Sequence, residues 1–492
     1  MFRVLILALV FSSFSVFADK PNILYIFTDD QSIRSVSCYE EAHPWVQTPN
    51  IDKLATSGVR FETCYTAAWC QPSRASMLTG KLQHNIDKLK LVDPYPNTVY
   101  DPETTPFWPA NFREKGYSTA CIGKWHLGED VGHGRDWDYS VIWDRMGPRS
   151  NSYAYYHKTL VRTNGGKREP LGGYSTDRYT DLAVDYIAKQ KDESKPWFLW
   201  LCYGGVHGPF TPAERHKDLY SDAPPAEVPA DIFGPREGLP EFMVNFTMWE
   251  KNKNGRPKGF DKAVKKYHRA VRSIDDGVGR LMKTLEETSQ LENTLVVFTS
   301  DQGMAKGQHG SKIKWLPYNA TIAAPLIFYY PKKIPAGKVS KEAVNGVDIT
   351  TTLHSFAGID LPWKMDGRDL KPIIENPDKS LSQPMLLSST AMLYGKAAIA
   401  ALNNKEYEEF KRRKVYSWIM FREGKYKYIR YLKDNCLEEV YNLENDPKEQ
   451  INLASKREQM ELVSELRKKA IEAYAENNPE FANALPEPKI LK

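Results

Sequence analysis

The sequence predicts an α/β fold in which a large, mixed and mostly parallel central sheet is flanked by helices, followed by a smaller C-terminal subdomain with an antiparallel sheet and a helix. Apolar runs without alternation are typical of strands buried on both faces of such a sheet. They occur at residues 23–28, 196–203, 294–299 and 324–328. Past about residue 385 the pattern changes to shorter strands. Because 492 residues exceed one ordinary core, we expect two domains, at 19–385 and 386–492.

The N-terminus has the parts of a secretory signal peptide. Arg3 precedes an apolar run at 4–11, and the small-residue end Val-Phe-Ala at 16–18 precedes Asp19. We therefore predict that residues 1–18 are a signal peptide and that the mature chain is exported, either to the periplasm or out of the cell. The run is too short to span a bilayer well, and no later stretch resembles a membrane span.

Charge and cysteine content narrow the function classes. The chain has 67 Lys and Arg against 62 Asp and Glu and no long basic block, so we expect no nucleic acid partner. Local cationic clusters remain available for an anionic substrate. Of the six cysteines, Cys121 and Cys202 lie in apolar runs that predict buried thiols. A disulfide between two of the others stays open, because spacing does not select a pair.

Carboxylates follow the first predicted strand and also the strand at 294–299. Asp29 and Asp30 end the first strand, and Asp301 with the amide Gln302 follows the later one. Adjacent carboxylates at the buried edge of a sheet are costly unless a cation neutralises them. An oxygen-only set suits Ca²⁺ or Mg²⁺ and argues against zinc. For the first pair alone, a solvated turn is the alternative.

The segment from Cys70 to Gly80 predicts a short helix at 72–79, with Pro72 at its start and a glycine at its exit. Cys70 then lies just before a helix N-terminus, where unpaired N–H groups and the helix dipole favour an anion. Arg74 follows about one turn later and offers planar donors for an oxyanion. Taken alone, a buried structural cysteine is the alternative interpretation.

Two further strand ends carry polar side chains. After a predicted strand at 118–122, Lys124 and His126 alternate along an extended segment and so point to one side. A surface lysine and a packed histidine are the alternative. His207 follows the strand at 196–203, at the edge where ligands bind α/β sheets, although a lone histidine is more often structural.

The segment at 133–180 is rich in Gly, Arg, Tyr and Trp and lacks a sustained period. We interpret it as an insertion over the mouth of the site, whose aromatic and Arg side chains would contact a sugar and its acidic groups. An ordinary packed loop is the alternative, and residues 211–260 predict a surface excursion. The remaining predicted elements are helices at 48–58, 106–116, 181–191, 260–290, 347–358 and 456–476, and strands at 416–421, 425–432 and 437–443.

Five motifs carry a family resemblance. They are Cys-x-Pro-Ser-Arg-Ala-Ser-x-Leu-Thr-Gly at 70–80, Asn-Ile-Leu-x-Ile-x-x-Asp-Asp at 22–30, Gly-Lys-Trp-His-Leu-Gly at 123–128, His-x-Pro-Phe at 207–210 and Val-Tyr-Asn-Leu-Glu-Asn-Asp-Pro at 440–447. Together they resemble the type I, formylglycine-dependent sulfatases of the alkaline phosphatase-like superfamily, including bacterial polysaccharide sulfatases. The resemblance covers nearly the whole mature chain and implies that the catalytic domain lies at 19–385.

The resemblance implies a modified residue and a metal ion. In that family an activating enzyme oxidises the cysteine to an aldehyde, so a formylglycine-generating or sulfatase-maturating enzyme would convert Cys70 to formylglycine (3-oxoalanine). A Ca²⁺ ion, with Mg²⁺ as the alternative, would be bound by Asp29, Asp30, the residue at position 70, Asp301 and Gln302. The family more often has Asn or His at the Gln302 position.

The resemblance also assigns cationic residues to the sulfate group. Arg74, Lys124 and Lys314 would neutralise it. Lys314 is chosen over Lys312 because the family's lysine lies eleven residues before the proline of the strand at 324–328.

Three histidines complete the implied site. The hydrated aldehyde would attack sulfur with one hydroxyl and form a covalent sulfate, while His207 protonates the leaving alcohol with Lys314 nearby. His126 would accept a proton from the second hydroxyl as sulfate is expelled. His309 is a further candidate for contact with the substrate.

The signal peptide and the aromatic segment favour an exported enzyme that acts on sulfated carbohydrate. Gly-Arg-Asp-Trp-Asp-Tyr at 134–139 is similar to sulfatases of marine polysaccharide degradation, so the predicted substrate is an algal galactan such as carrageenan. Glycosaminoglycan or aryl sulfates are the rival substrates. A phosphatase or phosphonate hydrolase of the same superfamily and an inactive sulfated-glycan binding protein are the alternative functions.

Overall fold

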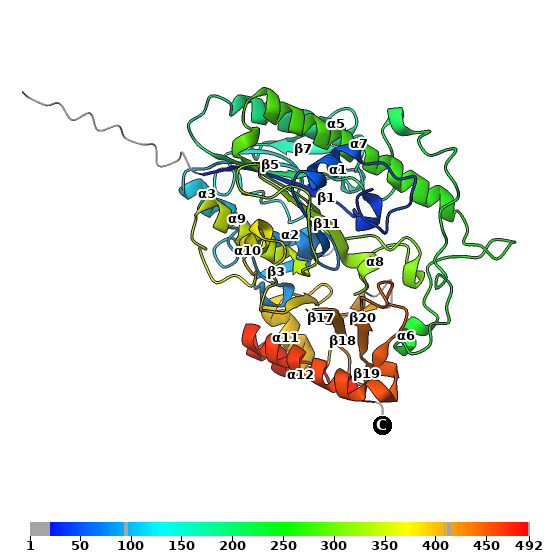
Figure 1. The fold of residues 1–492 in the computed structure, drawn as a ribbon. Coiled ribbons are helices and arrows are strands. Elements are labelled where there is room, and N and C mark those ends of the chain that lie inside the picture. Colours follow the sequence, from blue (N-terminus) through cyan, green and yellow to red (C-terminus); the bar gives the residue numbers. More distant parts are fainter. Residues whose placement is uncertain (1–19, 93–96, 408, 411–414, 491–492) are drawn as a thin grey trace, which may run out of the picture.

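An 11-stranded sheet runs through the middle of the molecule (Figure 1). The structure is a computed structural model that describes residues 20–92, 97–407, 409–410 and 415–490, so the predicted signal peptide lies outside the described residues. The strand order is β12-β2-β11-β10-β1-β9-β5-β6-β7-β8, with β13 beside β2. The bounds are β1 (Asn22–Thr28), β2 (Val59–Tyr65), β5 (Ser118–Lys124), β6 (Tyr139–Trp143), β7 (Leu160–Thr163), β8 (Arg168–Pro170), β9 (Trp197–Cys202), β10 (Thr294–Ser300), β11 (Ala323–Tyr329), β12 (Lys338–Ser340) and β13 (Val344–Asn345).

The centre of this sheet is parallel and its margins are mixed. Strands β10, β1, β9, β5 and β6 run parallel to one another. Strand β11 is antiparallel to β10 on one side, and β7 is antiparallel to β6 on the other. This arrangement confirms the predicted mixed, mostly parallel sheet.

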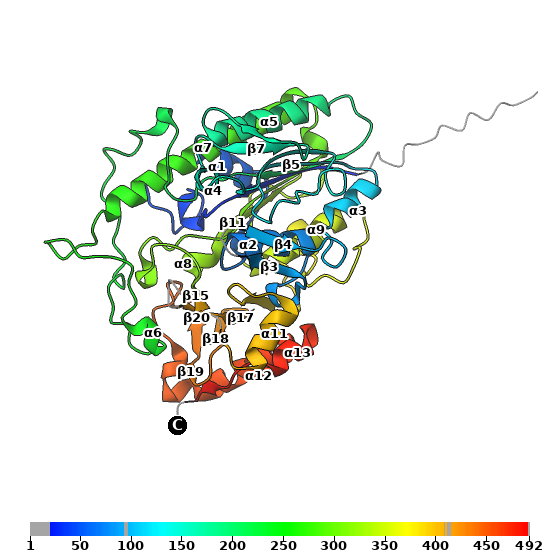
Figure 2. The same cartoon turned by 180° about the vertical axis from the view of Figure 1, so that it is seen from behind.

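Side chains of β1 are buried on both faces of the sheet, which explains its unbroken apolar sequence. Ile23 and Tyr25 belong to one apolar core and Leu24 and Ile26 to the other. Burial of each such side chain contributes about 1.5–3 kcal/mol. Figure 2 shows helices on both faces of the sheet. One layer contains α1 (Pro49–Thr56), α5 (Ser175–Lys189) and α7 (Phe260–Glu287), and the other contains α2 (Cys70–Thr79), α3 (Pro109–Glu114) and α9 (Gly346–Ala357).

A second, smaller sheet forms the C-terminal part of the molecule, as predicted. Its four antiparallel strands are, in order, β14 (Met385–Ser389), β17 (Trp418–Glu423), β18 (Tyr426–Tyr431) and β20 (Glu439–Asn442), and α12 (Met460–Asn477) packs against it. The remaining elements are α4 (Arg149–Ser152), α6 (Glu241–Val244), α8 (Asn319–Ile322), α10 (Lys371–Glu375), α11 (Gly395–Asn403), α13 (Pro479–Asn483), β3 (Leu89–Val92), β4 (Asn97–Tyr100), β15 (Glu409–Phe410), β16 (Val415–Tyr416), β19 (Cys436–Leu437) and β21 (Pro488–Lys489).

The segment at 133–180 differs from the predicted insertion. It supplies β6, which pairs in parallel with β5, and then β7 and β8, which extend the sheet. These strands have three to five residues, too few to show a clear period among the surrounding glycines and aromatic residues. Helix α5 likewise begins at Ser175 rather than at Asp181. The prediction of an insertion is therefore wrong for these strands, which belong to the central sheet.

The structure also bears on the cysteines and on membrane insertion. All six cysteines are free, so none of them forms a disulfide. Within the described ranges, no helix combines the length and apolar character needed to cross a lipid bilayer.

Candidate functional site

Pairing of β1 with β10 brings the acidic residues together. The two strands are parallel, with Thr28 opposite Ser300, so Asp29, Asp30 and Asp301 leave the sheet at the same edge. The backbone N–H of Asp30 donates to Oδ1 of Asp301 at 2.8 Å. All three side chains are buried. Strand pairing therefore forms one buried acidic cluster from residues that are distant in the sequence.

Helix α2 carries Cys70 to this cluster. The helix begins at Cys70 rather than at Pro72, and all ten of its residues are buried. The hydroxyl of Ser73 donates to the carbonyl of Asp301, which holds the first turn against the end of β10. The Sγ of Cys70 consequently lies 3.2 Å from Oδ1 of Asp29. Burial, reinforced by the two carboxylates, raises the pKa of the Cys70 thiol to about 12, so an unmodified thiol would be a poor nucleophile here.

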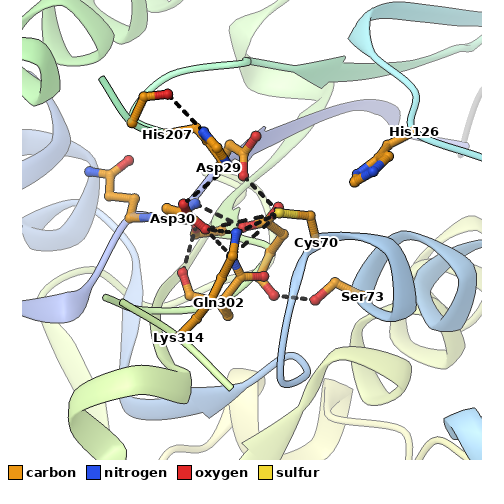
Figure 3. Close-up of polar contacts among 12 residues, drawn as sticks. Asp29, Asp30, Cys70, Ser73, His126, His207, Gln302 and Lys314 are labelled. Carbon is orange, nitrogen blue, oxygen red and sulfur yellow. Dashed lines mark hydrogen bonds and ion pairs between the residues drawn. The ribbon is translucent and has the colours of Figure 1, made fainter. Parts of the chain in front are cut away.

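The cluster has the chemistry of a site for a hard cation. Asp29, Asp30, Cys70 and Asp301 each place one ligand atom within 4.8 Å of the others. Gln302 contacts Asp30 through Nε2, while its buried Oε1 has no hydrogen-bond partner in the described part of the chain. Acidic, oxygen-rich ligand sets suit Ca²⁺ or Mg²⁺. The orphaned amide oxygen makes Gln302 a fitting additional ligand. Figure 3 shows Asp29, Asp30 and Gln302 converging beside Cys70.

Arg74 and Lys124 face the cluster from different elements. Nη2 of Arg74 lies 3.5 Å from Oδ2 of Asp301, and its Nη1 donates to the carbonyl of Lys124 at 2.7 Å. Lys124 ends β5 and pairs through Nζ with Asp29. Although burial acts in the opposite direction, Lys124 holds the pKa of the Asp29 carboxyl well below its usual value. Asp29 is therefore ionised at neutral pH.

Lys314 approaches from the long loop between β10 and β11. Its Nζ pairs with Asp30 and lies 2.8 Å from the Sγ of Cys70. Burial by itself would lower the pKa of this amine, but Asp30 and Cys70 hold it well above its usual value. Lys312 instead lies over the ring of Trp249, 4.7 Å from its centre. Of the two lysines weighed from the sequence, the structure thus brings Lys314 to the cluster.

His207 lies at the more open side of the cluster. Its Nε2 is 3.8 Å from Oδ2 of Asp30, and its side chain is 27% exposed. The ring stacks on Tyr155 with the ring centres 3.9 Å apart. Burial, aided by the positive charge of Lys314 and opposed by Asp30, lowers the pKa of His207 to about 4. The imidazole is therefore neutral at pH 7 in this state.

His126 lies apart from the acidic cluster, on the side of Cys70 (Figure 3). Nη1 of Arg145 is 2.7 Å from Nε2 of His126. Burial and then the Arg145 guanidinium hold the pKa of His126 well below its usual value. Sequence reasoning does not identify Arg145 or Tyr155. The signal available for them is the Arg and Tyr content of residues 133–180.

His309 is 1% exposed. Its ring stacks on Tyr318 at 3.8 Å, and its Nδ1 lies 3.5 Å from Oδ2 of Asp231. Contact between His309 and a substrate stays a prediction.

Comparison with known proteins identifies the family. The family model described as Sulfatase matches residues 21–359, and the model described as N-sulphoglucosamine sulphohydrolase, C-terminal, matches residues 307–476. An N-acetylglucosamine-6-O-sulfatase from Bacteroides thetaiotaomicron is 28% identical, covering 94% of this chain and 88% of its own length. An ulvan-active sulfatase from Formosa agariphila is also 28% identical, covering 94% of this chain and 82% of its own length.

Solved structures agree with this assignment. A structure in complex with D-glucosamine-2-N,6-O-disulfate, described as its substrate, has a TM-score of 0.75 at 26% identity and covers 94% of this chain and 99% of that one. A structure in complex with a neocarrahexaose has a TM-score of 0.67 at 23% identity, covers 96% and 95%, and shows a shared fold alone. Because the Sulfatase model matches more than half of the chain and includes the cluster around Cys70, the protein belongs to the sulfatase family and is a sulfuric ester hydrolase.

Proposed function

We propose that this sulfatase is an exported enzyme that removes sulfate from carbohydrates by means of a formylglycine made from Cys70. The observation that supports it best is the position of Cys70, which lies against an acidic cluster and next to Lys314. Arg74 and Lys124 pair with carboxylates of the same cluster. A sulfate ester repels nucleophiles because it is negatively charged, and positive groups fixed around the reacting centre offset that repulsion. The proposal assigns catalysis to residues 19–385.

Two groups complete the proposed site. Formylglycine at position 70, formed by an activating enzyme, would supply as its hydrate one hydroxyl that attacks sulfur and a second that allows sulfate to leave. A Ca²⁺ ion, with Mg²⁺ as the alternative, would be held by Asp29, Asp30, the residue at position 70, Asp301 and Gln302. It would polarise the sulfate oxygens. The buried carboxylates and the orphaned Oε1 of Gln302 support this ligand set.

Two histidines, His207 and His126, transfer protons in the proposed reaction. His207, at the exposed side, donates a proton to the oxygen of the leaving alcohol. Because its pKa is about 4 in the unliganded site, the negative charge of a bound sulfate ester is needed to favour the imidazolium form. His126 is kept neutral by burial and Arg145, so its ring can accept a proton when sulfate is released.

Sulfated carbohydrate is the substrate class that we propose, and two members of this class are candidates. The algal galactan rests on the run at 134–139, but Trp137 in that run is buried and packs against Phe198 and Trp200. A sulfated hexosamine is the second candidate, favoured by the similarity to an N-acetylglucosamine-6-O-sulfatase over 94% of this chain.

The test combines mass spectrometry with sulfate release. Protein coexpressed with an activating enzyme is incubated with carrageenan oligosaccharides, N-acetylglucosamine 6-O-sulfate, an aryl sulfate and an aryl phosphate. We expect the aldehyde mass in the peptide that contains position 70 and sulfate release from a carbohydrate, with no release by Cys70→Ala. An intact thiol in desulfating protein, or hydrolysis of the phosphate alone, would refute the proposal.

A further inference from the structure

A buried lysine beside the site has no acidic partner. Lys306 lies in the loop that follows β10, and its side chain is 9% exposed. Its Nζ is 3.5 Å from the ring centre of Phe210 and 4.2 Å from that of Tyr267. Arg34 donates to the two backbone carbonyls just before Lys306, which fixes this part of the loop. Among the residues that the structure describes, no carboxylate or other hydrogen-bonding group contacts the Lys306 amine.

The two rings connect Lys306 to the open side of the site. Tyr267 donates its hydroxyl to the carbonyl of Asp30 at 2.8 Å. The N–H of Phe210 donates to the carbonyl of His207 at 3.2 Å. Since His207 is the partly exposed histidine assigned to the leaving alcohol, Lys306 lies on the side where the alcohol part of the ester would bind.

A second polar side chain without a partner in the described part of the chain belongs to the segment that binds the Tyr267 hydroxyl. Gln31 stands between Asp30, whose carbonyl accepts from the Tyr267 hydroxyl, and Ser32, whose N–H donates to that hydroxyl at 2.9 Å. The Gln31 side chain is fully buried, and within the described structure neither its Oε1 nor its Nε2 has a hydrogen-bond partner. Buried amides are rarely left unpaired. Among the described residues, an unpaired amide therefore occurs in the same segment whose backbone binds the Tyr267 hydroxyl, and Lys306 lies against the ring of Tyr267 without an acidic partner. Together they indicate a place for a polar ligand group.

The sign of the unsatisfied charge indicates the kind of ligand. Attraction to two aromatic rings offsets only part of the cost of desolvating an ammonium group. Burial lowers the pKa of the Lys306 amine well below its usual value, and Arg34 adds a like charge while Asp30 acts in the opposite direction. A carboxylate or a sulfate within hydrogen-bonding distance would supply the missing negative charge.

We propose that Lys306 binds a second oxyanion of the substrate, a carboxylate or sulfate group carried by the alcohol part of the ester that is cleaved at position 70. This inference rests on the proposed function for the identity of the ester. It makes Lys306 a specificity residue that favours substrates with more than one acidic group.

The experiment measures binding separately from turnover. In a Cys70→Ala background, calorimetry compares two pairs of ligands that differ in sulfate content: N-acetylglucosamine 6-O-sulfate with glucosamine 2-N,6-O-disulfate, and a κ- with an ι-carrageenan tetrasaccharide. We expect the more sulfated member of at least one pair to bind at least tenfold more tightly. Lys306→Met should abolish this difference and change the affinity for the less sulfated member by less than twofold, whereas Lys306→Arg should retain most of it. Lys312→Met is the matched control, because Lys312 lies in the same loop, also over an aromatic ring.

Two results would overturn the inference. One is that the more sulfated ligand binds no more tightly in either pair, and the other is that Lys306→Met weakens both members of a pair equally. Sulfate release from the same ligands by formylglycine-containing protein tests the proposed function independently. If the protein prefers the more sulfated ligand but releases no sulfate, the proposed function is refuted and the Lys306 subsite is kept. If it releases sulfate but has no such preference, the subsite is refuted and the proposed function is kept. Thermal melting confirms that each variant is folded.

Discussion

The loop between β10 and β11 contains two buried lysines, and they have opposite environments. Lys314 is 7% exposed and Lys306 is 9% exposed. Lys314 pairs with Asp30, and its pKa is held well above the usual value. Lys306 faces two aromatic rings, and its pKa is well below the usual value. Equal burial thus has opposite results, because a nearby carboxylate decides whether a buried amine stays charged.

The part of the loop around Lys314 is held by the second sheet. Near Lys314, the indole N–H of Trp418 donates to the carbonyl of Trp315 at 2.9 Å, and the hydroxyl of Tyr318 donates to Glu439 at 3.0 Å. Trp418 lies in β17 and Glu439 lies in β20, so both groups belong to the C-terminal subdomain. That subdomain therefore supports the position of the lysine that approaches Cys70, although none of its described residues contributes a side chain to the acidic cluster.

The largest expected effect is on the Lys314 side of the comparison. Lys314→Met removes a positive charge next to position 70, so kcat/KM for sulfate release should fall roughly 10²–10³-fold, as for loss of one preorganised group in other enzymes. Steady-state kinetics would measure it. Lys312→Met, the control in the same loop, should stay within about twofold of the wild type. A Lys314 variant with nearly normal kcat/KM would show that Lys314 does not act on the sulfate.

Arg145→Met extends the comparison to His126, whose pKa is lowered by burial and by the neighbouring Arg145 guanidinium. Removing the guanidinium should raise the pKa of His126, so more of the ring is protonated at low pH and the acid limb of the kcat profile should move to higher pH. The loss in kcat should therefore be smaller at pH 8 than at low pH, about tenfold. Arg149→Met is the control, since Arg149 is exposed on the same segment. An unchanged pH profile would contradict the role of Arg145 in keeping His126 neutral.

The contribution of Glu439, which accepts from Tyr318, to the stability of the folded protein should depend on pH. Burial raises the pKa of Glu439 to about 7. Because this value is above the usual one, the folded state binds the proton more tightly, and stability falls as pH rises from about 4.5 to 7, by about 3 kcal/mol. Glu439→Gln cannot ionise, so its free energy of unfolding in urea should fall less between pH 5 and pH 8.

Glu444→Gln, at an exposed position of the same subdomain, is the control for Glu439 and should keep the pH dependence of the wild type. A Glu439 variant with the same dependence as that control would place the ionisation elsewhere.

The smallest expected effect concerns the unpaired lysine. Lys306→Met replaces a buried amine by an apolar side chain between two rings, so the free energy of unfolding should rise by about 1 kcal/mol. Thermal or urea unfolding would detect it, with Lys312→Met unchanged. A clear loss of stability would mean that the Lys306 amine has a partner in solution and would remove the contrast with Lys314.

Prediction from the sequence succeeded where the signal is local. The apolar runs predicted β1, β9, β10 and β11, because strands buried on both faces need an apolar residue at every position. Asp29 and Asp301 could then be placed at one edge, since parallel strands end together. Prediction failed at 133–180, where strands of three to five residues carry too little pattern. The start of α2 at Cys70 was missed by two residues, the usual precision for helix ends.

The sequence by itself determined the family, the central sheet and the chemical types around position 70, because a strand pattern and a motif are properties of neighbouring residues. Only the tertiary structure decided that Lys306 lies against two rings without a carboxylate partner among the described residues, and that Arg145 lies against His126. The left-handed backbone at Asp30, His126 and Lys306, with φ of 59°, 66° and 45°, is likewise imposed by the surrounding chain, since such residues rarely adopt it alone. The charge state of a buried side chain depends on groups that folding brings within a few ångströms, and those groups come from distant parts of the chain.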